Sequence, residues 1–172
     1  MRRGNSLTSP SKYLTEEAPV KNLKFLTEFM RQMGLGIEDV AEAAGVLTNS
    51  ARRWFLTDNM SLSKVMKVAE HFGYDIIIEY EIKETVINRT KIIIEEPRRI
   101  SDVDTTKRLS FIRVAMSRAG ITTTQLAEKL GCIRGAVQKF FQTDDTSVAN
   151  IYKIAEAFDW TVKITFKKKT SN

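Results

Sequence analysis

The sequence IEDVAEAAGVLTNSARRWFL at residues 37–56 occurs a second time in this 172-residue chain, as TTQLAEKLGCIRGAVQKFFQ at residues 123–142. The two stretches align without a gap at an offset of 86 residues. The matched pairs are Ala41 with Ala127, Gly45 with Gly131, Trp54 with Phe140, and Phe55 with Phe141. Since small and aromatic residues recur at the same places, we expect both stretches to adopt one local structure.

Each stretch has the pattern of two short helices joined by a tight turn. A small residue, Ala41 or Ala127, lets the helices approach closely, and Gly45 or Gly131 supplies the positive φ that ends the first helix. Apolar residues at helical spacing are expected to face inward. They are Val40, Ala44, Ala51, Trp54 and Phe55 in the first copy, and Leu126, Leu130, Val137, Phe140 and Phe141 in the second. This is a helix-turn-helix pattern, which holds its second helix out from the surface.

The repeat extends beyond this motif, from Leu23 to Phe72 in the first copy. Further helices are predicted on both sides of it: residues 20–33 ended by Gly34, residues 107–119 ended by Gly120, and a helix after each of the caps Ser61 and Ser147. Their predicted core includes Met33 and Ala119. An alignment of this length indicates two copies of one domain of about 60 to 65 residues.

The pattern then changes to the alternation of β-strands. Residues 74–82 and their copy, residues 160–166, are rich in β-branched and aromatic residues, and residues 85–87 and 91–95 are predicted to continue a meander. A strand that ends a helical unit leaves an unpaired edge, which another strand can cover. We therefore predict that residues 76–82 or 91–95 pair with residues 161–167 within one chain, as a pseudo-dimer. Pairing between two chains, as a homodimer, is the alternative.

The predicted organisation has four parts: a tail at residues 1–19, a first domain with its meander at 20–95, a linker at 96–105, and a second domain with its strand at 106–169. The tail is polar and is expected to be mobile. Its alternative role is an arm that lays Arg2 and Arg3 along a DNA groove.

The charge is distributed unevenly. The chain has a net charge of +6; residues 107–172 carry twelve Lys or Arg against five Asp or Glu, whereas residues 21–82 carry seven against nine. The second copy therefore has the charge of a polyanion binder and the first does not. No apolar run is long enough for a bilayer, and the start lacks the apolar segment of a signal peptide. Together with the single Cys132, this suggests a reducing cytosol.

Four helices with the motif in the second and third, followed by a strand, resemble the lambda-repressor and Cro-like (XRE) family of helix-turn-helix regulators. The resemblance covers roughly residues 20–80 and 106–167. It implies a mainly α fold with short β-strands: two tandem four-helix domains whose strands pair into a small antiparallel sheet. It also implies double-stranded DNA as the partner, in a bacterial nucleoid or a phage-infected cell, with regulation of transcription, most simply repression.

In this family, base contacts come from the start and outer face of the third helix. The matching positions are Thr48, Asn49, Arg52 and Arg53 in the first copy, and Arg134, Gly135, Gln138 and Lys139 in the second. Arg and Lys can donate to guanine, and Asn and Gln can bond adenine bidentately. The family's phosphate contacts match Thr57, Thr122, Thr123 and Thr143, through hydroxyl or backbone N–H groups.

Some residues depart from the family pattern. Leu47 and Ile133 stand where the family often has a polar residue, and they either contact thymine methyls or belong to the core. Gly135 leaves the third helix of the second copy without a side chain at one of the positions that match the family's base contacts. Asp58, Asp144 and Asp145 lie in the loop that should approach phosphate, which would repel a carboxylate.

The alternatives to a DNA-binding regulator are a protein-interaction module and an enzyme. The acidic first copy favours a protein-interaction module, as in antitoxins and phage-encoded regulators, with a protein partner on the first domain. Catalysis is not expected, because the sequence has no glycine-rich phosphate loop, no Cys/His set with metal-ligand spacing, and one histidine, His71. We accordingly expect no metal or cofactor, and the arginines, if not used for DNA, would form an ordinary solvated helix face.

Overall fold

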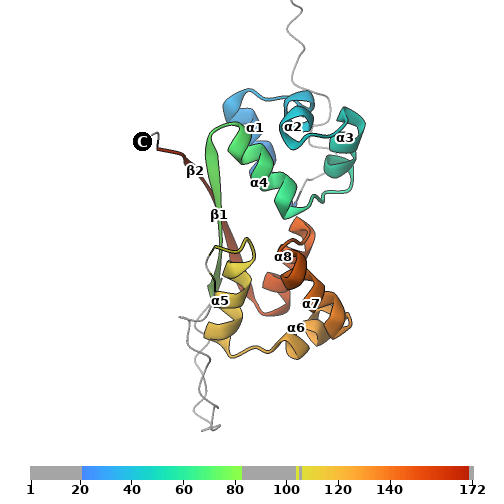
Figure 1. Ribbon diagram of the computed structural model, residues 1–172, viewed down its shortest axis with the longest axis vertical. Coiled ribbons are helices and arrows are strands. Elements are labelled where there is room, and N and C mark those ends of the chain that lie inside the picture. Colours follow the sequence, from blue (N-terminus) through green and yellow to red (C-terminus); the bar gives the residue numbers. More distant parts are fainter. Residues whose placement is uncertain (1–20, 83–103, 105, 171–172) are drawn as a thin grey trace, which may run out of the picture.

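The computed structural model describes residues 21–82, 104 and 106–170, which form four helices and a strand twice over (Figure 1). The first half comprises α1 (Lys24–Met33), α2 (Ile37–Ala44), α3 (Thr48–Leu56), α4 (Leu62–His71) and β1 (Tyr74–Ile82). The second half comprises α5 (Ser110–Ala119), α6 (Thr123–Leu130), α7 (Arg134–Thr143), α8 (Val148–Ala157) and β2 (Trp160–Lys168). The predicted tail at 1–19, the meander strands at 85–87 and 91–95, and all of the 96–105 linker except Asp104 lie outside the described residues.

Each element of the first half recurs 86 residues later, which is the offset that aligns the sequence. Only α7 differs, since it runs one residue further than the copy of α3. The helix stops recur too, with left-handed glycines of φ +65° to +68° at Gly34, Gly45, Gly120 and Gly131. These glycines supply the backbone conformation that the sequence predicted at the helix ends.

The two strands form one antiparallel ribbon, and Ile78 lies opposite Ile164 at its centre. These two residues are themselves equivalent in the repeat. Tyr74 therefore pairs with Lys168, while its copy Trp160 pairs with Ile82. Such reciprocal pairing relates the halves by an approximate two-fold axis, as in an isologous dimer. The prediction that residues 76–82 pair with 161–167 is confirmed.

The ribbon carries side chains of each half into the core of the other. Ile78 and Tyr80 of β1 are buried in the core of the second half, and the Tyr80 hydroxyl donates to the Ile151 carbonyl of α8 at 2.8 Å. In the opposite direction, the ring of Phe166 stacks on Phe29 of α1 with centroids 4.1 Å apart. Because each core contains residues from the other half, we infer that the two halves fold together rather than independently.

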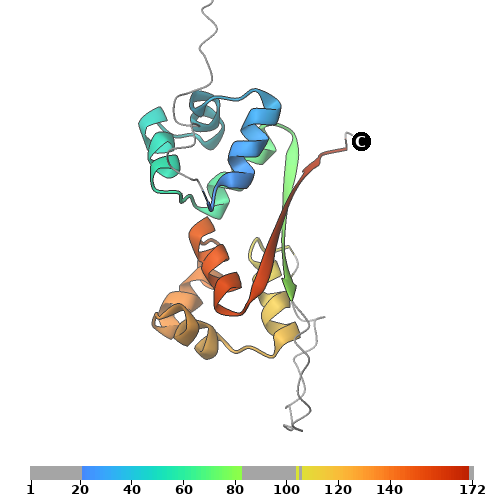
Figure 2. The same ribbon diagram turned by 180° about the vertical axis from the view of Figure 1, so that it is seen from behind.

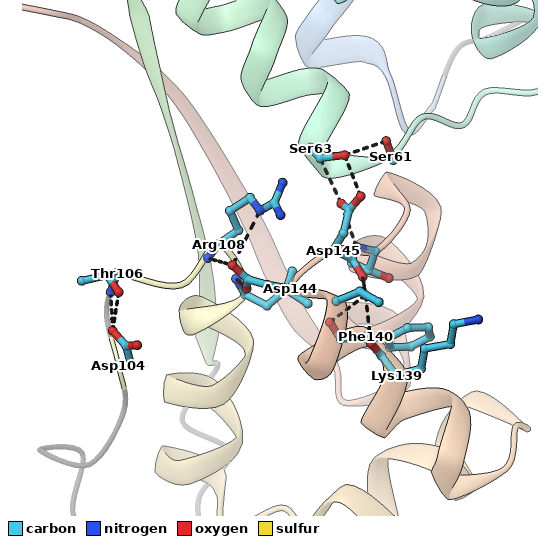
Figure 3. A network of polar contacts seen from close by, with 12 residues as sticks. Ser61, Ser63, Asp104, Thr106, Arg108, Lys139, Phe140, Asp144 and Asp145 are labelled. Carbon is cyan, nitrogen blue, oxygen red and sulfur yellow. Dashed lines mark hydrogen bonds and ion pairs between the residues drawn. The ribbon is translucent and has the colours of Figure 1, made fainter.

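The two halves make a second contact where α4 and α8 begin. Ser61 and its copy Ser147 form an isolated antiparallel bridge. The Leu62 N–H donates to the Thr146 carbonyl, and the Val148 N–H donates to the Met60 carbonyl, both at 2.8 Å. Figure 3 shows this junction with α4 above and the second half below. The halves thus contact each other at the ribbon and at these two helix starts.

Three expectations from the sequence differ from the structure. Ser61 occupies the N-cap position of α4, but its side chain makes no capping hydrogen bond, whereas Ser147 accepts one from the Asn150 N–H at 3.2 Å. Met33 and Ala119, at the last positions of α1 and α5, are exposed because the glycine turn ends each helix beyond the core. Trp54 and its copy Phe140 are only half-buried.

Within the described residues, no helix combines the length and apolar character needed to cross a membrane.

Candidate nucleic-acid interface

The helix pairs α2–α3 and α6–α7, here called the first and second motifs, are built in the same way. In the first motif the Val46 N–H donates back to the Ala41 carbonyl at 2.9 Å, and in the second the Cys132 N–H donates to the Ala127 carbonyl at 3.0 Å. These bonds close the turn after each left-handed glycine. Buried contacts then fix the second helix against the first, through Ala51 of α3 and Val137 of α7.

Both motifs lie on one side of the molecule. In Figure 1 the ribbon runs along the left, and α2–α3 and α6–α7 lie on the right, one above the other. Figure 2, turned by 180°, shows the same separation from behind. Since the approximate two-fold axis relates the motifs, α3 and α7 lie at equivalent positions on this side of the molecule.

Most of the predicted base-reading residues are accessible. Asn49 and Arg53 on α3 are exposed, and Thr48 and Arg52 are half-buried. On α7, Arg134, Gly135, Gln138 and Lys139 are all exposed. The outer face of α7 therefore combines two cations with an amide and a glycine.

Leu47 and Ile133, which directly precede these helices, are 79% and 78% exposed. The alternative that they belong to the core is therefore wrong. Large aliphatic side chains this exposed at the same place in both halves are suited to an apolar contact with a partner, such as thymine methyls. A Cβ added at Gly135 would lie 3.9 Å from Ile133 Cδ1, so the glycine leaves the flank of that side chain open.

The two motifs differ most in charge. Arg52 of α3 points back to α2, with its Nη2 3.5 Å from Oε1 of Glu38. The residues at the same places in the second motif are Gln138 and Thr124, which are neutral. The first turn of α2 contains Glu38 and Asp39, whereas the first turn of α6 contains no acidic residue.

Three of the four threonines predicted to contact phosphate use their hydroxyls within the fold. The Thr57 hydroxyl donates to the Arg53 carbonyl at 2.8 Å, and the Thr143 hydroxyl donates to the Lys139 carbonyl at 2.9 Å. Thr122 caps α6, accepting the Gln125 N–H at 3.2 Å while Gln125 Oε1 accepts the Thr122 N–H at 2.8 Å. Thr123 is half-buried at the first position of α6. A phosphate contact by Thr57 or Thr143 would require the hydroxyl to turn away from its helix.

The aspartates of the loop after each reading helix are turned inward, which the sequence did not reveal. Asp58 accepts the N–H groups of Asn22 and Leu23 at 2.7 and 3.0 Å, just before α1. Its copy Asp144 accepts those of Arg108 and Leu109 at 2.9 and 3.0 Å, as Figure 3 shows for Arg108. The positive φ of 49° at both positions turns the carboxylate toward these N–H groups.

Asp145 crosses to the other half instead. Its carboxylate accepts the Ser63 N–H at 3.0 Å and the Ser63 hydroxyl at 2.6 Å, at the start of α4 (Figure 3). These three carboxylates therefore accept N–H groups at the starts of helices, which is a structural role for the acidic residues of this loop. Asp and Asn are common helix caps, so the signal was present in the residue types.

Metal ligation and thiol chemistry have little support in the part of the chain that the structure describes. No group of three or more His, Cys, Asp or Glu side chains is arranged to hold a metal ion there. Cys132 is half-buried in the turn of the second motif. Both halves have an exposed outer face on the second helix of the motif, α3 or α7, and an exposed apolar residue directly before that helix.

No family model matches the chain, and no curated protein and no solved structure matches it either.

Proposed function

We propose that this protein is a sequence-specific double-stranded DNA-binding regulator, most simply a repressor, of the lambda-repressor and Cro-like type, with two tandem helix-turn-helix domains. The observation that carries the proposal is the presentation of α3 and α7 on one side of the molecule by an approximate two-fold axis. Paired reading helices of this kind address half-sites about one helical turn apart on the same face of a duplex.

The charge of the second motif supports the same reading. Arg134 and Lys139 are exposed on α7, where an arginine or lysine can donate to guanine or to phosphate. Because the two reading helices carry different side chains, the proposal implies an asymmetric site within one chain. A homodimer of this chain would instead select a longer, palindromic site.

Selection from a random duplex library, followed by a gel-shift with the selected site, tests the proposal. We expect one preferred sequence, and binding that ignores sequence would contradict it. Arg134→Ala with Lys139→Ala should weaken binding by at least about tenfold, because two cations leave the interface. Arg52→Ala with Arg53→Ala, which removes the same charge from the first motif, should weaken it less. The solution mass of the complex then gives the number of chains per site.

A protein-interaction module is the second candidate, favoured by the acidic surface of α2. Glu38, Asp39 and Glu42 are all exposed there. A partner that binds stoichiometrically to the purified full chain and is lost after Glu38→Thr with Glu42→Gln would support this function. The full chain is needed, because β1 and β2 complete each other's cores.

A further inference from the structure

The two motifs share a backbone design but not a charge pattern, and the difference is concentrated at one contact. Glu38 Oε1 lies 3.5 Å from Arg52 Nη2, and the side chains are 67% and 41% exposed. The pair therefore lies at the surface of the first motif, between the start of α2 and the outer face of α3. In the second motif the corresponding Thr124 and Gln138 carry no charge.

We propose that Glu38 is a specificity-determining residue that keeps the first motif from contributing its full share to DNA binding. It does so by holding Arg52 and by placing a carboxylate where DNA would approach. This inference rests on the proposed function and extends it, since the second motif then supplies most of the affinity and the two half-sites are read unequally.

The physical reason is a competition for one guanidinium. The Nη2 group that Arg52 directs at Glu38 can donate to a base or phosphate only if the side chain turns away, and an exposed ion pair is by itself weak enough to break. The carboxylate, however, remains beside the duplex after the pair opens. It then repels the phosphates of the duplex at the N-terminus of α2. The backbone N–H groups and the helix dipole at that end would otherwise attract phosphate.

The second half shows which residue can replace Glu38. Thr124 occupies the position of Glu38 in an exposed first turn of α6, so the backbone of this design accepts threonine there. Glu38→Thr therefore tests the carboxylate with minimal change to the fold. Asp39→Gln offers a second variant that removes a carboxylate from the same turn. Asp39 accepts the Gly36 N–H at 2.7 Å, and its equivalent Gln125 accepts the Thr122 N–H in the same way, so glutamine can keep this hydrogen bond.

The experiment measures the affinity of four full-length proteins for the selected site: wild type, Glu38→Thr, Arg52→Ala, and the two changes combined. We expect Glu38→Thr to bind at least about fivefold more tightly, with a salt dependence about one unit steeper on the log–log plot. Arg52→Ala alone should change affinity less than about twofold. In the combined variant the gain should be clearly smaller, because the share that comes from a guanidinium no longer held by Glu38 is removed and only the loss of the carboxylate remains.

Four further measurements complete the design. Glu28→Gln removes the same charge from α1, where Glu28 pairs with Lys24, and should leave affinity within about twofold of wild type. Thr124→Glu with Gln138→Arg transplants the pair into the second motif and should weaken binding by at least about tenfold. Footprinting of Glu38→Thr should show new protection at the half-site of the first motif. Equal unfolding midpoints will show that the variants are folded.

The outcomes separate the two levels of the proposal. If wild type binds its site but Glu38→Thr binds no more tightly, this inference is overturned and the proposed function stands. A gain of the same size without Arg52 also overturns it, because the charge of Glu38 alone would then explain the effect. If no variant binds DNA, both the proposed function and this inference fail.

Discussion

Asp145 of the second half caps the helix that begins beside Ser63 of the first half, 82 positions away in the sequence. Its equivalent, Asn59, reaches across in the opposite direction and accepts the Ala149 N–H at 3.1 Å. Each half thus supplies a cap for the fourth helix of the other. Because these bonds form only when the halves are docked, they connect helix stability to the assembly of the whole chain.

Substitution of Asp145 separates its capping role from its charge. Asp145→Ala removes the cap of α4 and should lower the free energy of unfolding by about 1 to 2 kcal/mol. Asp145→Asn should retain most of the stability, because Asn59 performs the same task at the equivalent position. Chemical denaturation of both variants checks this. If alanine and asparagine were equally destabilising, the charge rather than the hydrogen bond would be responsible.

On the outer face of the ribbon, β1 carries acidic residues and β2 carries lysines. β1 exposes Asp75, Glu79 and Glu81, and β2 exposes Lys163 and Lys167. The register places Asp75 opposite Lys167 and Glu79 opposite Lys163. If β1 instead paired with a second β1 about the same centre, Asp75 would face Glu81, and like charges directly opposite are destabilising. The pattern therefore favours the pairing of β1 with β2.

A charge exchange tests this pattern. Lys163→Glu with Lys167→Glu should lower the free energy of unfolding by about 1 kcal/mol, since cross-strand pairs are worth about 0.2 to 1 kcal/mol each. Adding Asp75→Lys and Glu79→Lys should restore most of it, and the remainder belongs to the Lys163–Glu81 ion pair at 3.8 Å. The loss should shrink in about 1 M salt, which screens exposed charges. Lys129→Glu with Lys153→Glu, an equal change of net charge elsewhere, provides the control. Failure of the fourfold variant to recover would contradict the pairing argument.

Tyr80 makes the fold sensitive to alkali. Burial raises the pKa of its hydroxyl above the usual 10.0. Since the folded state holds this proton more tightly than the unfolded state, the stabilisation is complete below pH 10 and is lost as the pH rises above it. We expect the free energy of unfolding to be level from pH 7 to 9 and to fall above about pH 10.

Tyr80→Phe provides the matching variant. It removes the hydrogen bond to the Ile151 carbonyl and should cost about 1 kcal/mol at neutral pH. It should also flatten the alkaline loss in a denaturation series from pH 7 to 11. Tyr152 is the residue to compare with Tyr80, because the pKa of its hydroxyl is also raised. The main cause is partial burial, and the second is the Asp58 carboxylate. If Tyr80→Phe lost stability as steeply as wild type above pH 10, another group would be responsible.

Ile133 offers a test of apolar readout under the proposed function. Ile133→Ala should leave stability unchanged, because the side chain is 78% exposed. It should weaken binding to the selected site by about fivefold if the side chain covers a thymine methyl. Replacing that thymine by deoxyuridine should produce the same loss in wild type and no further loss in the variant. Losses that add together would place Ile133 away from the methyl.

Local features of the fold could be predicted from the sequence because they depend on residues close together in the chain. The glycines at Gly45 and Gly131 end the first helix of each motif as expected. The alternation at residues 74–82 also gave the bounds of β1. These are effects of φ preference and hydrophobic period, which act within a few residues.

Contacts between the halves could not be predicted in the same way. Asp58 and Asp145 are both aspartates shortly after α3 or α7, yet one caps its own half and the other caps the opposite half. Which partner each carboxylate meets depends on how the halves dock. The Glu38–Arg52 contact likewise depends on the crossing of α2 and α3. Residue type indicated that the aspartates could act as caps, but not which N–H groups they would accept.

The pairing of Ile78 with Ile164 has a consequence for how the protein can evolve. In a dimer of identical chains, every substitution appears on both sides of the axis, so a change that suits one side must be tolerated on the other. Here one gene encodes the two sides as separate codons, and they remain joined by a shared ribbon. Either side can therefore accumulate changes on its own, while the axis that aligns them is retained.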